Sequence, residues 1–250
     1  MQTRTSLLTL RLPQWITGLA EGILDLLFPP RCAGCGRPGV VWCSTCAADA
    51  RPITPPICSL CGTPGVTGKR CPRCQEDPLQ LEGVRSCFVY HGPIRRALHR
   101  LKFHGRYRIA QVLASQMAEG WARFGMEADL LIPVPTSKAR QRQRGYNQAA
   151  MLGQALAKRL AIPLHPYALR RVRATRSQVG LARSARRENV QGAFLGDPRW
   201  VQGKRVVVVD DVCTSGATLE ACAIALYQAG AASVWGFTLA RVIMGRALHE

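Results

Sequence analysis

The clearest pattern of hydrophobic positions along the chain is a run of four valines, Val206–Val209. Such a β-branched run is typical of a strand that is buried on both faces of a parallel sheet. Two carboxylates follow it, then a short hydroxyl-rich turn, and then a helical pattern from Leu219 to about Gln228. The pattern predicts a strand, a tight polar turn and a helix in direct succession.

Strand and helix patterns alternate along much of the remaining chain. Further strands are predicted at Val84–Tyr90, Ala128–Val134, His165–Arg173 and Val234–Arg241, and further helices at Ile94–Phe103, Arg108–Phe124 and Asn147–Leu160. Strands joined through helices imply right-handed crossovers and parallel pairing. The predicted fold class is therefore α/β, with a mostly parallel twisted sheet. Ala174–Gly196 is instead long, polar and rich in arginine, which leaves open a functional loop or a solvated loop with a short helix.

The N-terminal apolar stretch Trp15–Phe28 predicts an amphipathic helix and not an export signal. Its apolar residues recur at helical spacing, Glu21 and Asp25 interrupt it, and no small-residue cleavage site follows. We expect this helix, assigned to residues 1–27, to pack on the protein and not on a membrane. No apolar run of about 18 residues occurs, so we expect no membrane insertion and a cytoplasmic location.

Cysteines are unusually frequent near the N-terminus. Eight of the 11 cysteines form four Cys-x-x-Cys pairs: Cys32/Cys35, Cys43/Cys46, Cys58/Cys61 and Cys71/Cys74. This spacing lets two thiolates of one tight turn reach the same tetrahedral metal ion. The four pairs therefore predict two closed, structural zinc sites. The module that contains them, residues 28–80, resembles a double zinc ribbon.

Alternatives to this zinc assignment remain open at the sequence level. Consecutive pairing is favoured, with the first four cysteines on one metal and the last four on the other, although an interleaved arrangement uses the same residues. An iron site would have the same ligands, and disulfides are the weaker interpretation because the cytosol keeps thiols reduced. Cys87, Cys213 and Cys222 are unpaired and are predicted to be small apolar core residues.

Charge changes the picture further. The 250 residues contain 34 Lys and Arg against 15 Asp and Glu, a net charge of +19, and half of the basic residues fall in Arg95–Arg108, Lys138–Arg144 and Arg170–Arg187. One interpretation is a set of solvated basic faces. The other is a polyanionic partner, either a phosphorylated substrate or nucleic acid. The candidate nucleic-acid residues are Arg95, Arg96, Arg100, Lys102, Arg140, Arg142, Arg176, Arg183, Arg186 and Arg187.

The turn after Val206–Val209 carries the candidate chemistry. A strand, a tight turn and a helix N-terminus together present free backbone N–H groups to an anion, and the hydroxyls of Thr214, Ser215 and Thr218 add donors. A plain strand–helix junction with an N-cap would explain the hydroxyls. It would not explain Asp210 and Asp211, because adjacent buried carboxylates are costly unless sugar hydroxyls, a metal or backbone donors meet them.

This stretch resembles the phosphoribosyl pyrophosphate (PRPP) signature of type I phosphoribosyltransferases. The resemblance implies that Asp210 and Asp211, as the catalytic pair, meet the ribose hydroxyls. It also implies that Thr214, Ser215, Gly216, Ala217 and Thr218 hold the 5′-phosphate. Pyrophosphate would be gripped after an earlier strand, by Pro135, Thr136 and Ser137, with Lys138 and Arg144 beyond them. Magnesium would accompany PRPP, and the fold would be of type I phosphoribosyltransferase type at residues 81–242, with a tail at 243–250.

Additional motifs make the resemblance more specific. They are Pro133-Val134-Pro135, Arg144-Gly145-Tyr146-Asn147-Gln148, Thr175-Arg176-Ser177-Gln178, Leu181, Arg187-Glu188-Asn189-Val190 and Gly192-Ala193-Phe194. With the cysteine module, they are similar to the ComF (ComF/GntX) family of competence proteins. That resemblance implies a role in DNA uptake during natural transformation, acting on single-stranded DNA with a helicase partner. A metabolic phosphoribosyltransferase with a nucleobase-like acceptor is the alternative, and a zinc-stabilised interaction module is a third hypothesis.

Overall fold

A computed structural model of the chain describes residues 29–104, 107–137, 141–142, 145–173 and 183–243. The helix predicted at 1–27 and all of the predicted tail except its first residue lie outside these ranges. None of the helices in the described ranges combines the length and the apolar character that crossing a bilayer requires.

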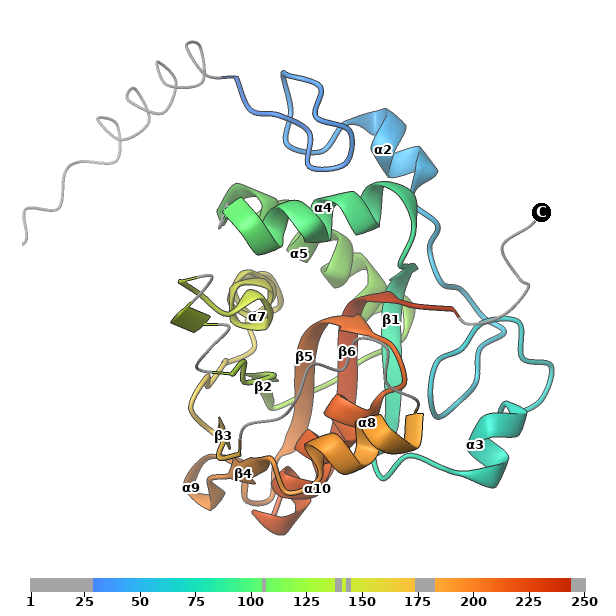
Figure 1. Cartoon of the computed structure of the whole chain (residues 1–250), viewed down its shortest axis with the longest axis vertical. Helices are drawn as coiled ribbons and strands as arrows, with labels where there is room; N and C mark the ends of the chain where they lie inside the picture. The colour runs from blue at the N-terminus through green and yellow to red at the C-terminus, as the bar shows by residue number, and fades with distance from the viewer. Residues whose placement is uncertain (1–28, 105–106, 138–140, 143–144, 174–182, 244–250) are drawn as a thin grey trace, which may run out of the picture.

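Helices and strands alternate through most of the described chain (Figure 1). The strands are β1 (Gly83–Val89), β2 (Leu130–Pro133), β3 (Leu169–Arg171), β4 (Phe194–Gly196), β5 (Arg205–Cys213) and β6 (Ser233–Arg241). The helices are α2 (Ser44–Asp49), α3 (Pro72–Glu76), α4 (Gly92–His104), α5 (Tyr107–Arg123), α7 (Gln148–Leu160), α8 (Arg183–Val190), α9 (Pro198–Val201) and α10 (Ala217–Gln228).

Four strands form one parallel sheet in the order β1-β6-β5-β2. The valine run lies in β5, where Val208 is paired with Gly236 of β6 and with Ile132 of β2. Residues of this run are at most 1% exposed, because helices cover the sheet on both faces. The observed sheet confirms the prediction of a mostly parallel α/β fold.

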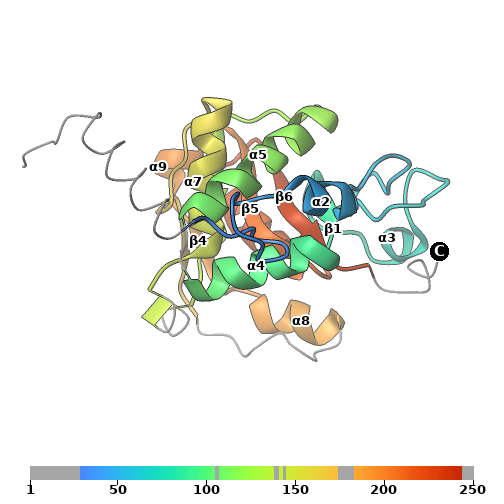
Figure 2. The ribbon, with the colours of Figure 1, turned by 90° about the horizontal axis from the view of Figure 1, so that it is seen from above.

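The two faces of the sheet bury different partners, since successive side chains of a strand point to opposite faces. Val207 and Val209 pack in a cluster with α4, α5 and α7, and the last two helices lie side by side (Figure 2). Val206 and Val208 belong to the opposite cluster, which contains α10 and the cysteines from Cys58 to Cys74. The second half of the cysteine module is therefore part of the domain core.

The strand predicted at His165–Arg173 is shorter than expected. Only Leu169–Arg171 forms β3, which pairs antiparallel with β4 outside the main sheet. The N–H of His165 donates to the carbonyl of Leu131 at the edge of β2, but Pro166 follows at once and the chain turns. Proline has no backbone donor, so it ends the pairing with β2. The arginine-rich segment that follows contains α8 and β4 in its described part.

The cysteine module covers the edge of the sheet that is formed by β1. Strand β1 is the outer strand, and its Val84 N–H donates to the carbonyl of Leu60 at 2.7 Å. Further along, the N–H of Val89 donates to Arg51 O at 2.9 Å. Exposed strand edges pair readily with other chains, so this cover protects the sheet against aggregation.

Candidate functional site

The eight predicted zinc ligands form two compact clusters in chain order. We call Cys32, Cys35, Cys43 and Cys46 the first zinc site, and Cys58, Cys61, Cys71 and Cys74 the second zinc site. Within each cluster all four sulfur atoms lie within 4.8 Å of one another. This grouping agrees with the consecutive pairing that the sequence favours.

Sulfur separations in both clusters fit a tetrahedral zinc ion. Cys32 Sγ lies 3.6 Å from Cys43 Sγ, and Cys61 Sγ lies 3.7 Å from Cys71 Sγ. Four sulfurs bound at about 2.3 Å around one zinc would be roughly 3.8 Å apart. Since each site has four protein ligands and no open position, its zinc would be structural and not catalytic.

Backbone N–H groups favour the thiolate form that zinc requires. Burial acts to raise the pKa of Cys32, but backbone donors, led by the N–H of Cys43 at 3.4 Å, outweigh it and lower that pKa to about 6. In the second site, burial is likewise outweighed at Cys58, whose pKa falls to about 6 because the N–H groups of Cys71 and Cys61 donate to its sulfur. One sulfur in each cluster is therefore prepared for metal binding by backbone donors of its own turn and of the facing turn.

The predicted phosphate loop, Thr214–Thr218, lies between β5 and α10. Gly216 is the N-cap of α10 with a φ of 86°, a left-handed conformation that glycine adopts without strain. The buried hydroxyl of Ser215 accepts a hydrogen bond from the N–H of Ala217 at 3.4 Å. The loop thus leads directly into a helix N-terminus at the carboxyl edge of a parallel sheet, where α/β folds bind ligands.

Asp210 and Asp211 lie within β5 and not after it, which corrects the strand end that the valine run predicts. The strand continues because β6 also continues, with Asp210 opposite Thr238 and Cys213 opposite Arg241. The N–H of Asp211 donates to Asp210 Oδ1 at 2.9 Å. Burial, and then the charge of Asp211, raises the pKa of Asp210 well above its usual range. The two adjacent carboxylates repel each other, and a ligand that offers hydrogen-bond donors to them would reduce this repulsion.

Lys102, one of the predicted nucleic-acid residues, lies beside the carboxylate pair. Its Nζ lies 3.6 Å from Asp211 Oδ2, and both side chains are partly buried. Lys102 comes from α4, so this helix brings a positive charge to the carboxylate pair. A cation beside the carboxylate pair can offset its charge in the free protein and contact anionic oxygens of a ligand.

The predicted pyrophosphate segment starts at the same edge of the sheet. Pro135, Thr136 and Ser137 follow β2, and the N–H of Val134 donates to Val209 O at 2.9 Å, next to Asp210. Asn147 supports this exit, because its Nδ2 donates to Val134 O while its Oδ1 caps α7. The predicted residues Lys138, Arg140 and Arg144 lie outside the described ranges.

The predicted arginines of α4 line a groove of about 510 Å³, which we call the basic groove. Its lining residues are His91, Gly92, Arg95, Arg96, His99 and Arg100. Arg96 Nε donates to Gly34 O, and Arg100 Nη1 donates to Cys32 O, so both arginines also anchor the first zinc site on α4. Arg95 is exposed.

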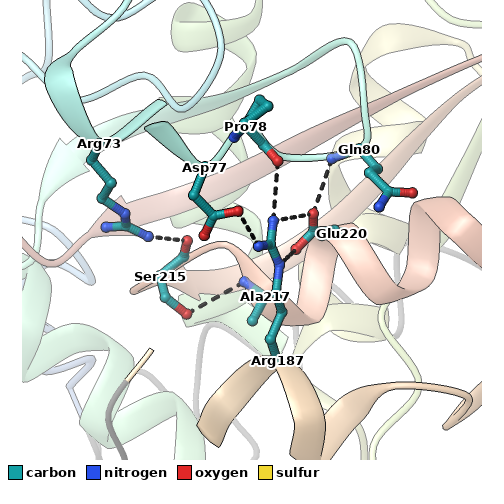
Figure 3. Close-up of polar contacts among 8 residues, drawn as sticks. All are labelled: Arg73, Asp77, Pro78, Gln80, Arg187, Ser215, Ala217 and Glu220. Carbon is teal, nitrogen blue, oxygen red and sulfur yellow. Dashed lines mark hydrogen bonds and ion pairs between the residues drawn. The ribbon is translucent and has the colours of Figure 1, made fainter. Parts of the chain in front are cut away.

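The remaining predicted arginines fall in different surroundings. Arg142 is exposed, Arg176 lies outside the described ranges, and Arg183 and Arg186 belong to α8. Arg187, also in α8, is held by carboxylates: it binds Asp77, and its Nε and Nη2 lie 2.6 Å from Glu220 Oε2 and Oε1 (Figure 3). The hydrogen bonds with Glu220, followed by that with Asp77, raise the pKa of Arg187.

Sequence reasoning missed two contacts, one between the second zinc site and the phosphate loop and one between β6 and the end of β5. Arg73 Nη2 donates to Ser215 O at 2.6 Å, and the buried Arg241 donates from Nη1 to Cys213 Sγ at 3.2 Å. Burial acts to lower the pKa of Arg241, but Cys213 and the cysteines of the second zinc site outweigh it and raise that pKa. The sequence did contain one signal that α10 has polar partners elsewhere in the chain: Glu220 is an acid among the apolar positions of this helix.

The chain matches two family models, described as a double zinc ribbon domain over residues 23–75 and a phosphoribosyl transferase domain over residues 147–248. It is 33% identical to the DNA utilization protein YhgH of Escherichia coli O157:H7 over 207 residues, which cover 80% of this chain and 90% of that protein. It is 30% identical to competence protein ComFC of Bacillus subtilis over 213 residues, 82% and 86% of the two chains.

Competence protein F of Haemophilus influenzae is 32% identical over 180 residues, which cover 69% of this chain and 79% of that protein. The three relatives therefore align with this chain over most of their own lengths. Within this chain the zinc ribbons precede the phosphoribosyltransferase domain. Identity of this extent, across both parts of the molecule, shows that the chain belongs to the ComF family of competence proteins.

Proposed function

We propose that this protein binds PRPP with Mg²⁺ at residues 206–218 and acts in the cytoplasm in DNA uptake during natural transformation. The observation that carries the proposal is the grouping of Asp210, Asp211 and the phosphate loop at one edge of the sheet, with Lys102 beside the carboxylates. Two carboxylates suit ribose hydroxyls, and a helix N-terminus suits a phosphate. The names of the relatives, for competence and DNA utilization, support the cellular role.

Each part of the ligand has a counterpart among the described residues. The 5′-phosphate would accept hydrogen bonds from the loop that ends at Thr218, and pyrophosphate would lie toward Thr136 and Ser137. Mg²⁺ would enter with the ligand, since this ion prefers carboxylate and phosphate oxygens and would balance their charge. Binding would remove the repulsion between the paired carboxylates, because their oxygens would then face donors.

Calorimetry with PRPP and Mg²⁺ tests the ligand assignment. The double variant Asp210→Asn/Asp211→Asn should lose the binding heat and the thermal stabilisation that PRPP gives the wild type. Glu119→Gln/Glu127→Gln removes two carboxylates from exposed positions and serves as the matched control, which should bind as the wild type does. Equal binding by the two double variants would overturn the assignment.

Single-stranded DNA is the second ligand in the proposal, and the basic groove on α4 is its proposed contact surface. The groove is lined by three arginines and two histidines, and Arg95 among them is exposed. Cationic side chains on one face supply the sequence-independent part of nucleic-acid affinity. A competence helicase is the proposed protein partner, which would hand the strand to this surface.

The alternative proposal is an enzymatic reaction at the same site, in which ribose 5-phosphate is transferred from PRPP to a nucleobase-like acceptor. The intact carboxylate pair favours it, since positioning and charge neutralisation supply much of the catalysis at such a centre. Release of pyrophosphate from PRPP, measured with nucleobases and with single-stranded DNA as acceptors, distinguishes a transferase from a binding protein. Stoichiometric binding without pyrophosphate release in any of these mixtures would exclude turnover with these acceptors.

A further inference from the structure

The second zinc site contacts the phosphate loop directly. Arg73 lies in α3, between the zinc ligands Cys71 and Cys74, and its Nη2 donates to the carbonyl of Ser215 at 2.6 Å (Figure 3). The side chain is thus fixed at its base by a zinc knuckle and at its tip by the loop. This contact joins residues that are 142 positions apart in the chain.

The hydrogen bond from Arg73 orients the backbone of the loop. A trans peptide is planar, so its C=O and N–H point in opposite directions. Because the carbonyl of Ser215 points to Arg73, the N–H of Gly216 points away from the zinc knuckle. That N–H is one of the donors that a phosphate at the start of α10 would use.

A second set of contacts fixes the start of α10 against the same ribbon. Glu220 is only 2% exposed, and its Oε1 accepts from the N–H of Gln80 at 3.0 Å as well as from Arg187. Leu79 packs on Gly216 so closely that a Cβ there would lie 3.0 Å from Leu79 Cδ1. The segment that follows the last zinc ligand therefore supports both the loop and the first turn of the helix.

Zinc would control whether these supports exist. Zinc knuckles fold only around their metal, so loss of zinc from the second site would release Arg73 and the segment after Cys74. The first zinc site is anchored elsewhere, on α4, through Arg96 and Arg100. The two zinc sites are therefore not equivalent with respect to the phosphate loop.

We propose that Arg73 is a positioning residue for the phosphate loop and that zinc in the second site and PRPP at Thr214–Thr218 stabilise each other's binding. The proposal rests on the proposed function of the loop. Linkage is reciprocal, so zinc in the second site strengthens PRPP binding and PRPP retains that zinc. Zinc in the first site contributes little to this linkage.

Zinc release from the wild-type protein provides a test that needs no variant of the ribbon. A chromophoric chelator is added to the zinc-loaded chain, and release is followed with and without PRPP and Mg²⁺. The second site, whose cysteines are all buried, should release its zinc in the slower phase. PRPP should slow that phase by about fivefold or more, the usual lower range of allosteric coupling, and leave the faster phase unchanged.

Variants of Arg73 identify the contact that carries the effect. Arg73→Met should weaken PRPP binding about tenfold, as expected for a lost charge-assisted hydrogen bond, and should abolish the protection of zinc by PRPP. Arg73→Lys retains one donor and should recover part of both. Arg70→Met removes an exposed arginine of the same ribbon and should behave as the wild type does.

Two controls separate the possible failures. Asp210→Asn/Asp211→Asn, mixed with the same PRPP, reports any zinc that PRPP itself removes from the protein. If the wild type binds no PRPP, the proposed function fails and the linkage fails with it. If the wild type binds PRPP but its slow zinc phase is unchanged, or if Arg73→Met with both zinc ions in place binds PRPP equally well, only the linkage is overturned.

Discussion

At the scale of single residues, Asp210 occupies a position that costs the free protein stability. Burial and the charge of Asp211 raise its pKa. The folded protein therefore binds the proton of this carboxyl group more tightly than the unfolded chain does. This proton binding favours folding fully below the unfolded-state pKa, and the contribution is lost as the pH rises through the folded-state pKa. Functional sites commonly carry such a cost, because the ligand and not the fold requires the charge.

Asp210→Asn should therefore stabilise the ligand-free protein while PRPP binding is lost. The amide oxygen can still accept from the N–H of Asp211, and the side chain no longer ionises. We expect a Tm a few degrees above that of the wild type at neutral pH and a smaller gain in acid, measured by thermal unfolding across the pH range. Asp129→Asn should show the opposite trend, because Arg205 lowers the pKa of Asp129. A gain that does not depend on pH would contradict the argument.

Glu220 and Arg187 form the other pair whose energetics the structure defines. Glu220 is almost fully buried, so removal of its cationic partner leaves a carboxylate without compensation. Arg187→Met should destabilise the protein by about 3 kcal/mol, and Arg187→Met/Glu220→Gln should recover much of that loss. Thermal unfolding of the three chains measures the difference. Similar losses in the single and the double variant would show that the loss does not come from an uncompensated carboxylate at Glu220.

At the scale of elements, local sequence patterns predicted most strands and helices but not their lengths. The buried run Val206–Val209 identified β5 correctly, yet its true end depends on pairing with β6, a partner whose extent no local pattern states. Pro166 could have shortened the strand predicted at His165–Arg173, since proline interrupts pairing. The end of an element is therefore predictable where a proline sets it and not where a distant partner does.

Helix α4 combines two roles that the sequence could not separate. Its arginines were predicted as one basic surface, but Arg96 and Arg100 bind carbonyls of the first zinc site and Lys102 lies at Asp211. Charge clustering shows where cations occur along the chain and not which of them have partners in the fold. Within the described part of α4, Arg95 is the most direct test of DNA binding, because its exposed side chain lines the basic groove.

Arg95→Ala should weaken binding to an oligothymidine several-fold. It should also reduce the slope of log affinity against log salt by about 0.7, the value for one lost phosphate contact on a single strand. Arg199→Ala removes a positive charge from α9, where the side chain is 81% exposed and paired with Asp197, and should change affinity little. Fluorescence anisotropy over a range of salt concentrations gives both quantities. Equal losses in the two variants would indicate non-specific attraction to the net charge.

At the scale of the whole molecule, the sequence predicted the parts of the protein better than their connections. Spacing alone identified both cysteine clusters, because four thiolates of one metal site come from two local turns. The contacts of Arg73 with Ser215 and of Arg241 with Cys213 could not be predicted this way, since each joins segments far apart in the chain. The Arg73 contact joins the second zinc site to the phosphate loop, and the cysteines of that site belong to the same core cluster as Val206 and Val208 of β5.

Removal of zinc should therefore damage the two halves of the module unequally. Metal analysis should return about two zinc equivalents per chain. When a strong chelator removes both, the ribbon that covers β1 loses its fold, because zinc-knuckle folding depends on the metal, and the edge of the sheet becomes exposed. We expect a lower Tm and concentration-dependent aggregation, measured by light scattering.

Cys35→Ser weakens the first site at an exposed ligand, and Cys58→Ser removes a buried ligand of the second. Aggregation should follow Cys58→Ser much more strongly than Cys35→Ser, and the reverse order would show that the first site, and not the second, protects the sheet.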